Sequence, residues 1–276
     1  MEGEREKATK AFRELSKSLR SLPGNPVPKD VHKLRTAARR VEAIVSALPG
    51  DGKKARRLLK TIAAVRKAAG GVRDMDVLSA NARKTARYAA GDSLTRLLEV
   101  LQAARQQNAG EFTRTLGRRR KAARENLKDY AKLVKAALNG VPANGKTGKG
   151  QPGQPDAQLH AMAMRAVRDL GEWPPLDAGN IHEFRLKVKE LRYILQLHAE
   201  PESELANALW RVQRRIGDWH DWHQLGEIAR EVLHSEGDQP LLAHIEHTAQ
   251  RKFDQALKTA NALRGKYLSA PLALGI

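Results

Sequence analysis

The chain has 276 residues, of which 41% are hydrophobic and only 4% aromatic. This apolar content excludes a disordered polycation, and the abundance of Ala, Leu, Arg and Lys favours helices over sheets. Lys and Arg total 50 against 31 Asp and Glu, and the net charge of +19 is typical of proteins that bind nucleic acid, anionic membranes or phosphate polymers. Cysteine is absent, which excludes disulfides and thiolate metal sites. No long apolar run occurs, so we expect a cytoplasmic protein without a membrane span.

Helical periodicity runs through nearly the whole chain and is interrupted by short Gly and Pro groups. We expect breaks at Gly70-Gly71 and near Gly217, with Asp74 and Asp221 capping the helices that follow. The predicted helices are residues 4–21, 28–48, 52–69, 74–89, 93–138, 156–171, 180–199, 202–216, 221–235 and 240–265. The segment 93–138 is long for one helix, and its glycines Gly110 and Gly117 are possible break points.

A flexible linker is predicted at residues 139–155, which contain five Gly and three Pro without an apolar period. It separates an N-terminal helical half, residues 1–138, from a C-terminal half, residues 156–276. The halves repeat two motifs. Val31-His32-x-Leu34-Arg35 recurs as Ile181-His182-x-Phe184-Arg185, and Gly70-x-x-Arg73-Asp74 recurs as Gly217-x-x-His220-Asp221. The repeat indicates two related helical bundles.

Each half carries a basic stripe beside its core stripe when the residues are placed on a helix at about 100° per residue. In the C-terminal half the core stripe comprises Ile181, Phe184, Val188, Leu191 and Leu195, and the basic stripe comprises His182, Arg185, Lys189 and Arg192. In the N-terminal half the core stripe comprises Val31, Leu34, Ala38, Val41 and Val45, and the basic stripe comprises His32, Arg35 and Arg39. Apolar residues lie again beyond each basic stripe, among them Leu186 and Ile194 in the C-terminal half.

This placement points to an anion site. Solvated charges normally lie opposite the core, whereas these stripes lie between two apolar sectors, and residues 181–192 hold no acid on the stripe itself. Crowded cations repel one another unless an anion is bound, and Arg and Lys both bind phosphate oxygens. Two stripes could converge on one elongated anion. The simpler reading is a solvated face or a set of salt-bridge partners one helical turn apart.

The stripes, the run Lys189-Glu190-Leu191-Arg192-Tyr193 and the Gly-x-x-Arg/His-Asp elements together resemble the CHAD family, the conserved-histidine α-helical domain, over residues 5 to 268. The resemblance implies an all-α fold of two four-helix bundles, related by an internal pseudo-two-fold axis with a basic groove or pore between them. It also implies binding of inorganic polyphosphate and association with polyphosphate or polyester storage granules. The binding role carries over to His32, Arg35, Arg39, Arg73, His182, Arg185, Lys189 and Arg192. Glu42 departs from the pattern because it stands where Arg192 stands in the second half.

Other function classes stay open at this point. A nucleic-acid binder would explain the charge equally well, but the few aromatic residues and the position of the stripes disfavour it. An enzyme would need a carboxylate cluster or a nucleophile–base pair, and none can be argued from the spacing, so we expect no catalysis, metal or cofactor. A granule-coat protein is a further alternative. The run Arg118-Arg119-Arg120-Lys121 is expected to form a solvated face that could extend the attraction for anions.

Overall fold

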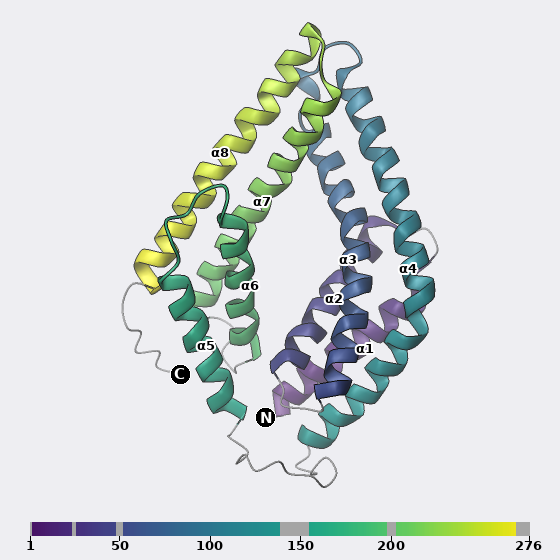
Figure 1. Ribbon diagram of the computed structural model, residues 1–276, viewed down its shortest axis with the longest axis vertical. Coiled ribbons are helices and arrows are strands. Elements are labelled where there is room, and N and C mark those ends of the chain that lie inside the picture. Colours follow the sequence, from purple (N-terminus) through teal and green to yellow (C-terminus); the bar gives the residue numbers. More distant parts are fainter. Residues whose placement is uncertain (1, 24–25, 48–51, 139–154, 198–202, 269–276) are drawn as a thin grey trace. The chain divides into compact units, whose positions relative to one another are not determined.

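The computed structural model describes residues 2–23, 26–47, 52–138, 155–197 and 203–268, and within these it is built of α-helices without strands (Figure 1). The all-α prediction is therefore confirmed. The helices are α1 (Glu2–Ser21), α2 (Pro28–Ala47), α3 (Gly52–Arg83), α4 (Ser93–Leu138), α5 (Pro155–Gly171), α6 (Ile181–Leu197), α7 (Glu204–Val232) and α8 (Gln239–Leu263). Short helical turns lie at Ala86–Tyr88, Glu236–Asp238 and Arg264–Leu268. Among the described helices, none has the length and apolar character needed to cross a membrane.

Two of the predicted helix breaks are wrong. The α3 helix continues through Gly70 and Gly71, and α7 continues through Gly217. Asp74 and Asp221 therefore lie inside helices and do not cap them. The α4 helix also runs unbroken past Gly110 and Gly117. Helix propensity is a weak local preference, and packing against neighbouring helices overrides it at these glycines.

Two compact units make up the chain. Unit 1 comprises Met1–Asp74 and Ala104–Leu159, so its described part holds α1, α2 and long portions of α3 and α4. The predicted core stripe of α2 is confirmed, since all five of its residues are buried. Phe12 of α1 stacks on Tyr130 of α4 with ring centroids 6.2 Å apart. At Gly71 an added Cβ would come within 2.9 Å of the Asn108 side chain, so only glycine lets α3 approach α4 this closely.

Unit 2 comprises Met75–Ala103 and His160–Ile276. In it α7 and α8 lie side by side and antiparallel, and α6 packs along α7 (Figure 1). Leu78, Leu97 and Leu101 of the 75–103 segment share a buried cluster with residues of α7 and α8, which explains why this segment groups with the C-terminal part of the chain. The predicted core stripe of α6 is confirmed as well, with all five residues buried.

The compact units and the sequence repeat divide the chain differently, because residues 75–103 belong to the N-terminal half by sequence and to unit 2 by contacts. Two four-helix bundles related by a two-fold axis stay a prediction. The predicted linker, residues 139–155, lies outside the described residues except for Pro155, at which α5 begins.

Candidate functional site

The basic stripe of unit 1 is organised by an arginine that packs on a glycine. The guanidinium of Arg35 on α2 lies against Gly70 of α3, where an added Cβ would come within 2.5 Å of Nη1. Asp74 lies one turn further along α3. Burial lowers the pKa of Arg35, the charge of Asp74 raises it, and the charges of Arg39, Arg66 and Arg73 lower it further. An arginine stays charged in proteins, so the lowered pKa reflects first the burial of the guanidinium and then the neighbouring positive charges, and not deprotonation.

The other predicted residues of unit 1 gather around the same point. Partial burial lowers the pKa of His32, and the charges of Arg73, Arg35 and Arg39 lower it further. The structure therefore brings all four predicted residues of this unit into one electrostatic cluster. Nε of Arg39 is buried and has no hydrogen-bond partner among the described residues. A buried donor of this kind is costly to leave unsatisfied.

Unit 2 repeats the arrangement. The guanidinium of Arg185 on α6 lies against Gly217 of α7, where an added Cβ would come within 2.8 Å of Nη2. Nε of Arg185 donates a hydrogen bond to the Gln213 carbonyl oxygen at 3.1 Å. Nε of Arg192 donates to Oε1 of the same Gln213 at 2.9 Å. Gln213 thus holds two stripe arginines in place, a role that sequence reasoning missed because it depends on how α6 and α7 pack.

A histidine pair lies at the other end of this stripe. The rings of His182 on α6 and His220 on α7 have centroids 4.8 Å apart. The pKa of His220 is lowered to about 4, first by burial and then by the charges of His182, Arg185 and His223. The pKa of His182 is also lowered, by burial and by Arg185 and Lys189, against an opposing effect of Glu183. Nδ1 of His182 is buried and, in the described part of the chain, has no hydrogen-bond partner.

His220 was not among the predicted site residues, although the repeat offered a signal for it. It occupies the position that Arg73 holds in the first half. Its pairing with His182 mirrors the closeness of Arg73 to His32.

The two stripes differ in net charge at one equivalent pair. In unit 1, Nε of Arg66 on α3 forms an ion pair with Glu42 on α2 at 2.7 Å. The equivalent pair in unit 2 is Gln213 on α7 with Arg192 on α6. The arginine of unit 1 is therefore neutralised by a carboxylate, while Arg192 is held by a neutral amide and lies over the ring of Tyr193. Glu42, which departs from the sequence pattern at the position of Arg192, thus forms an ion pair inside unit 1.

Two comparisons with known proteins gave matches. The family model for the CHAD domain matches residues 6–230. The chain belongs to the CHAD-domain family. Among solved structures, PptA from Streptomyces chartreusis is similar, with 13% identity, a TM-score of 0.70, and coverage of 95% of this chain and 98% of that chain. At this identity the likeness concerns the fold alone. No curated protein matches the sequence.

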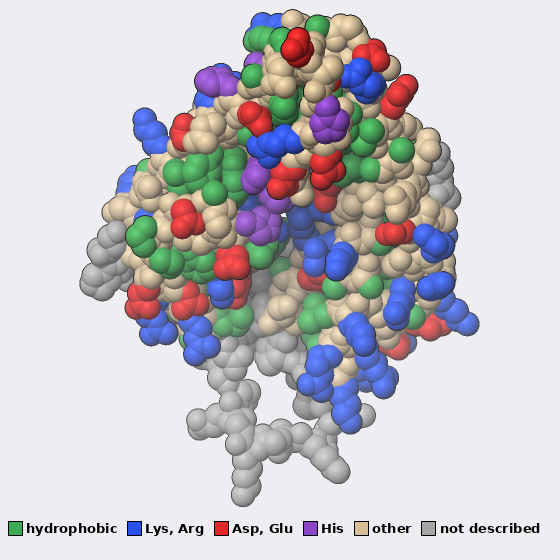
Figure 2. Space-filling model, turned by 45° about the horizontal axis from the view of Figure 1, so that its top comes forward, with side chains coloured by type: hydrophobic (Ala, Val, Ile, Leu, Met, Phe, Trp, Pro, Cys, Tyr) green, Lys and Arg blue, Asp and Glu red, His purple; other side chains and the backbone are tan. Residues whose placement is uncertain are grey.

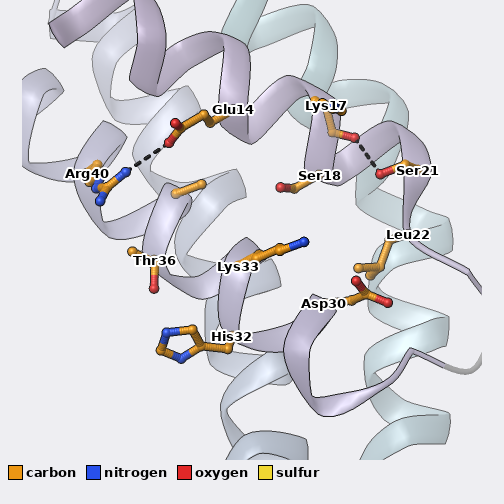
Figure 3. Close-up of a pocket in the computed structure, with 11 residues that line it drawn as sticks. Glu14, Lys17, Ser18, Ser21, Leu22, Asp30, His32, Lys33, Thr36 and Arg40 are labelled. Carbon is orange, nitrogen blue, oxygen red and sulfur yellow. Dashed lines mark hydrogen bonds and ion pairs between the residues drawn. The ribbon is translucent and has the colours of Figure 1, made fainter.

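A groove of about 460 Å³ between α1 and α2 adjoins the stripe of this CHAD domain in unit 1 (Figure 3). His32 lies at one end of the groove, and Ser18 and Lys33 point into it. Arg40 donates to Glu14 at 2.9 Å across another edge. Contiguous groups of Lys and Arg side chains are also visible on the surface in Figure 2, in keeping with the charge of +19.

The run of basic residues on α4 has a partly structural role. Arg118, Arg119 and Lys121 are exposed, as expected for a solvated face. Nη2 of Arg120 instead donates to the Leu22 carbonyl oxygen at 2.8 Å, just beyond the end of α1. Within the described residues, no group of three or more His, Asp or Glu side chains could hold a metal ion.

The contact between Arg185 and Gly217 leads to a prediction with opposite signs for stability and binding. In Gly217→Ala the new Cβ would displace the flexible Arg185 side chain, while alanine favours the helix by about 1 kcal/mol. We expect an equal or higher Tm and an affinity for a phosphate polymer that is lower by about tenfold. Gly226→Ala in the same helix is the control, because its Cβ would meet only Ile245 Cγ2 at 3.8 Å. Equal affinities of both variants would show that the packing of Arg185 against Gly217 does not contribute to binding of the phosphate polymer.

Proposed function

We propose that this CHAD domain binds inorganic polyphosphate, without catalysing a reaction on it, through the basic stripe of each unit. The proposal is carried by a packing contact that occurs in both units. The guanidinium of Arg35 lies against Gly70, and that of Arg185 lies against Gly217. Near Arg35 lie Arg39 and Arg73 of the same cluster, with Asp74 as an opposing charge. In unit 2, Arg185 and Lys189 both lie close enough to His182 to lower its pKa. Such crowding costs free energy in the free protein, and a bound anion would relieve it.

The form of the stripe supports a polymeric ligand. From His182 to Arg192 the cations of α6 extend over about 15 Å along the helix, which suits a linear chain of phosphates better than one small anion. Arginine offers forked donors to phosphate oxygens and Lys189 adds a point charge. Each stripe offers such a chain its own row of cations, and recruitment to polyphosphate or polyester storage granules would be the consequence of binding in the cell.

A competition experiment tests this proposal against nucleic-acid binding. A fluorescent DNA duplex is bound to the purified chain, and long-chain polyphosphate or unlabelled duplex is added at moderate salt while anisotropy is followed. We expect polyphosphate to displace the duplex at a lower concentration of phosphate groups than unlabelled duplex does. Failure of polyphosphate to displace it would overturn the proposal. Release of orthophosphate from polyphosphate in the presence of Mg²⁺ or Mn²⁺, above a heat-inactivated control, would overturn its non-catalytic part.

A further inference from the structure

One aromatic side chain of unit 2, Trp210, is half-exposed. Trp210 on α7 is 48% exposed, and it is the one aromatic residue among the large exposed hydrophobic residues found there. The guanidinium of Arg214, one turn further along, lies 5.4 Å from the centroid of its ring system. A ligand that covered this half-exposed indole would gain hydrophobic free energy.

Trp210 lies at the end of the basic stripe. Residues 210 and 217 are seven positions apart, which places them within about 20° of each other around the helix and about 10 Å apart along it. Arg185 packs against Gly217. Between positions 210 and 217, Gln213 accepts a hydrogen bond from Arg192. Because α6 and α7 run antiparallel (Figure 1), the order along the pair is His220 with His182, then Gly217 with Arg185, then Gln213 with Arg192, then Trp210. A ligand that follows the stripe from the histidines reaches the indole last.

This order of groups matches a ligand with a planar ring attached to a chain of phosphates. In such a complex the cations would bind phosphate oxygens and the indole would offer a face for stacking. Arg214 forms a cation–π contact with the same indole. Inorganic polyphosphate has no ring and would leave the indole unused. The equivalent position in the first half is Ala63, so only the unit 2 stripe has this feature.

We propose that the basic stripe of unit 2 binds nucleoside polyphosphates, with the phosphates along Arg185, Lys189 and Arg192 and the base stacked on Trp210. The proposal rests on the proposed function, since it uses the same cations for the phosphates. It adds a second class of ligand and names the residue that distinguishes it from inorganic polyphosphate.

The test compares two ligands with the same number of phosphates. Binding of ATP and of inorganic tripolyphosphate to the full chain is measured by calorimetry, without divalent cations and at one ionic strength. Base stacking is worth about 1–3 kcal/mol, so we expect Trp210→Ala to lower the affinity for ATP by roughly tenfold to a hundredfold and to change that for tripolyphosphate less than about twofold. Trp210→Phe should retain much of the ATP affinity, and Leu186→Ala, which removes another side chain that is 49% exposed in unit 2, should affect neither ligand.

The outcomes separate this inference from the proposed function. If the wild-type chain binds neither ligand, the proposed function fails as well. If it binds tripolyphosphate, but Trp210→Ala weakens both ligands equally or neither, the proposed function stands and the stacking role is wrong. If Trp210→Ala changes the oligomeric state and keeps its ATP binding, Trp210 is a protein-docking residue and the proposal is overturned. ATP quenching of tryptophan fluorescence that persists in Trp210→Phe would place the base elsewhere.

Discussion

Replacing Arg35 and Arg185 together by alanine should weaken polyphosphate binding by more than about 2 kcal/mol, or roughly thirtyfold. Each guanidinium is seated on a helix glycine and fixed in the middle of its stripe, so its donors are oriented before the ligand arrives. We also expect Arg185→Ala alone to cost more than Arg35→Ala alone. In unit 1 the nearby Arg66 forms an ion pair with Glu42, whereas in unit 2 the partner of Arg192 at the equivalent position is the neutral amide of Gln213. Calorimetric titration with polyphosphate of defined length measures all three variants.

The matched control removes the same charge at exposed sites. Arg56→Ala with Arg165→Ala takes one exposed arginine from each unit, and it should change the affinity less than about threefold. Circular dichroism checks that helicity is kept, because loss of Arg35 leaves Asp74 without that neighbouring cation. If the alanine variant unfolds, Arg35→Lys with Arg185→Lys keeps the charges, loses the forked donors and should give an intermediate loss. Equal losses in the control and in the double variant would mean diffuse attraction and no defined site.

Much of this site could be predicted from the sequence because helical spacing alone fixes which residues share a face. The core stripes of α2 and α6 are buried as expected, and the cations beside them gather as expected. The expectation of apolar packing on the far side of the stripe holds at Ile194, which is buried, and fails at Leu186, which is 49% exposed. A helical wheel gives directions around one helix, but it cannot say how far the neighbouring helix extends over them.

The glycines show why the rest could not be predicted. Gly70 and Gly217 were expected to end helices, since glycine is a poor helix former and an aspartate follows in the same turn. In the structure both lie in mid-helix, where the missing side chain leaves room for a guanidinium from the next helix. Their repetition at equal spacing in the two halves was a signal of a shared packing role. The roles of Arg66 and Gln213 gave no such signal, because they depend on contacts between α2 and α3 and between α6 and α7.

Polyphosphate binding should strengthen as the pH falls, because the stripe histidines His32 and His182, and His220 beside them, are disfavoured as cations in the free protein and become favourable cations beside phosphate. The pKa of His220 is lowered to about 4 by burial and by His182, Arg185 and His223, with Glu227 opposing. The pKa of His182 is lowered by burial, Arg185 and Lys189, with Glu183 opposing, and that of His32 by burial and three arginines. A bound phosphate chain raises these pKa values, so binding takes up protons. Each proton taken up strengthens binding by up to about tenfold per pH unit.

The free protein should respond to pH in the opposite direction. The unfolded chain, in which His220 has its ordinary pKa of 6.5, binds the proton more readily than the folded chain does. The stability contributed by neutral His220 is therefore fully present above pH 6.5 and is lost as the pH falls from 6.5 towards 4. Thermal unfolding across this range, with and without polyphosphate, measures both effects. We expect His182→Gln with His220→Gln to reduce the pH dependence of Tm in the free protein and that of the affinity. A polyphosphate affinity that stays constant between pH 8 and pH 5 in the wild type would show that the histidines take no part in binding. The role of the arginines is tested separately by the alanine variants.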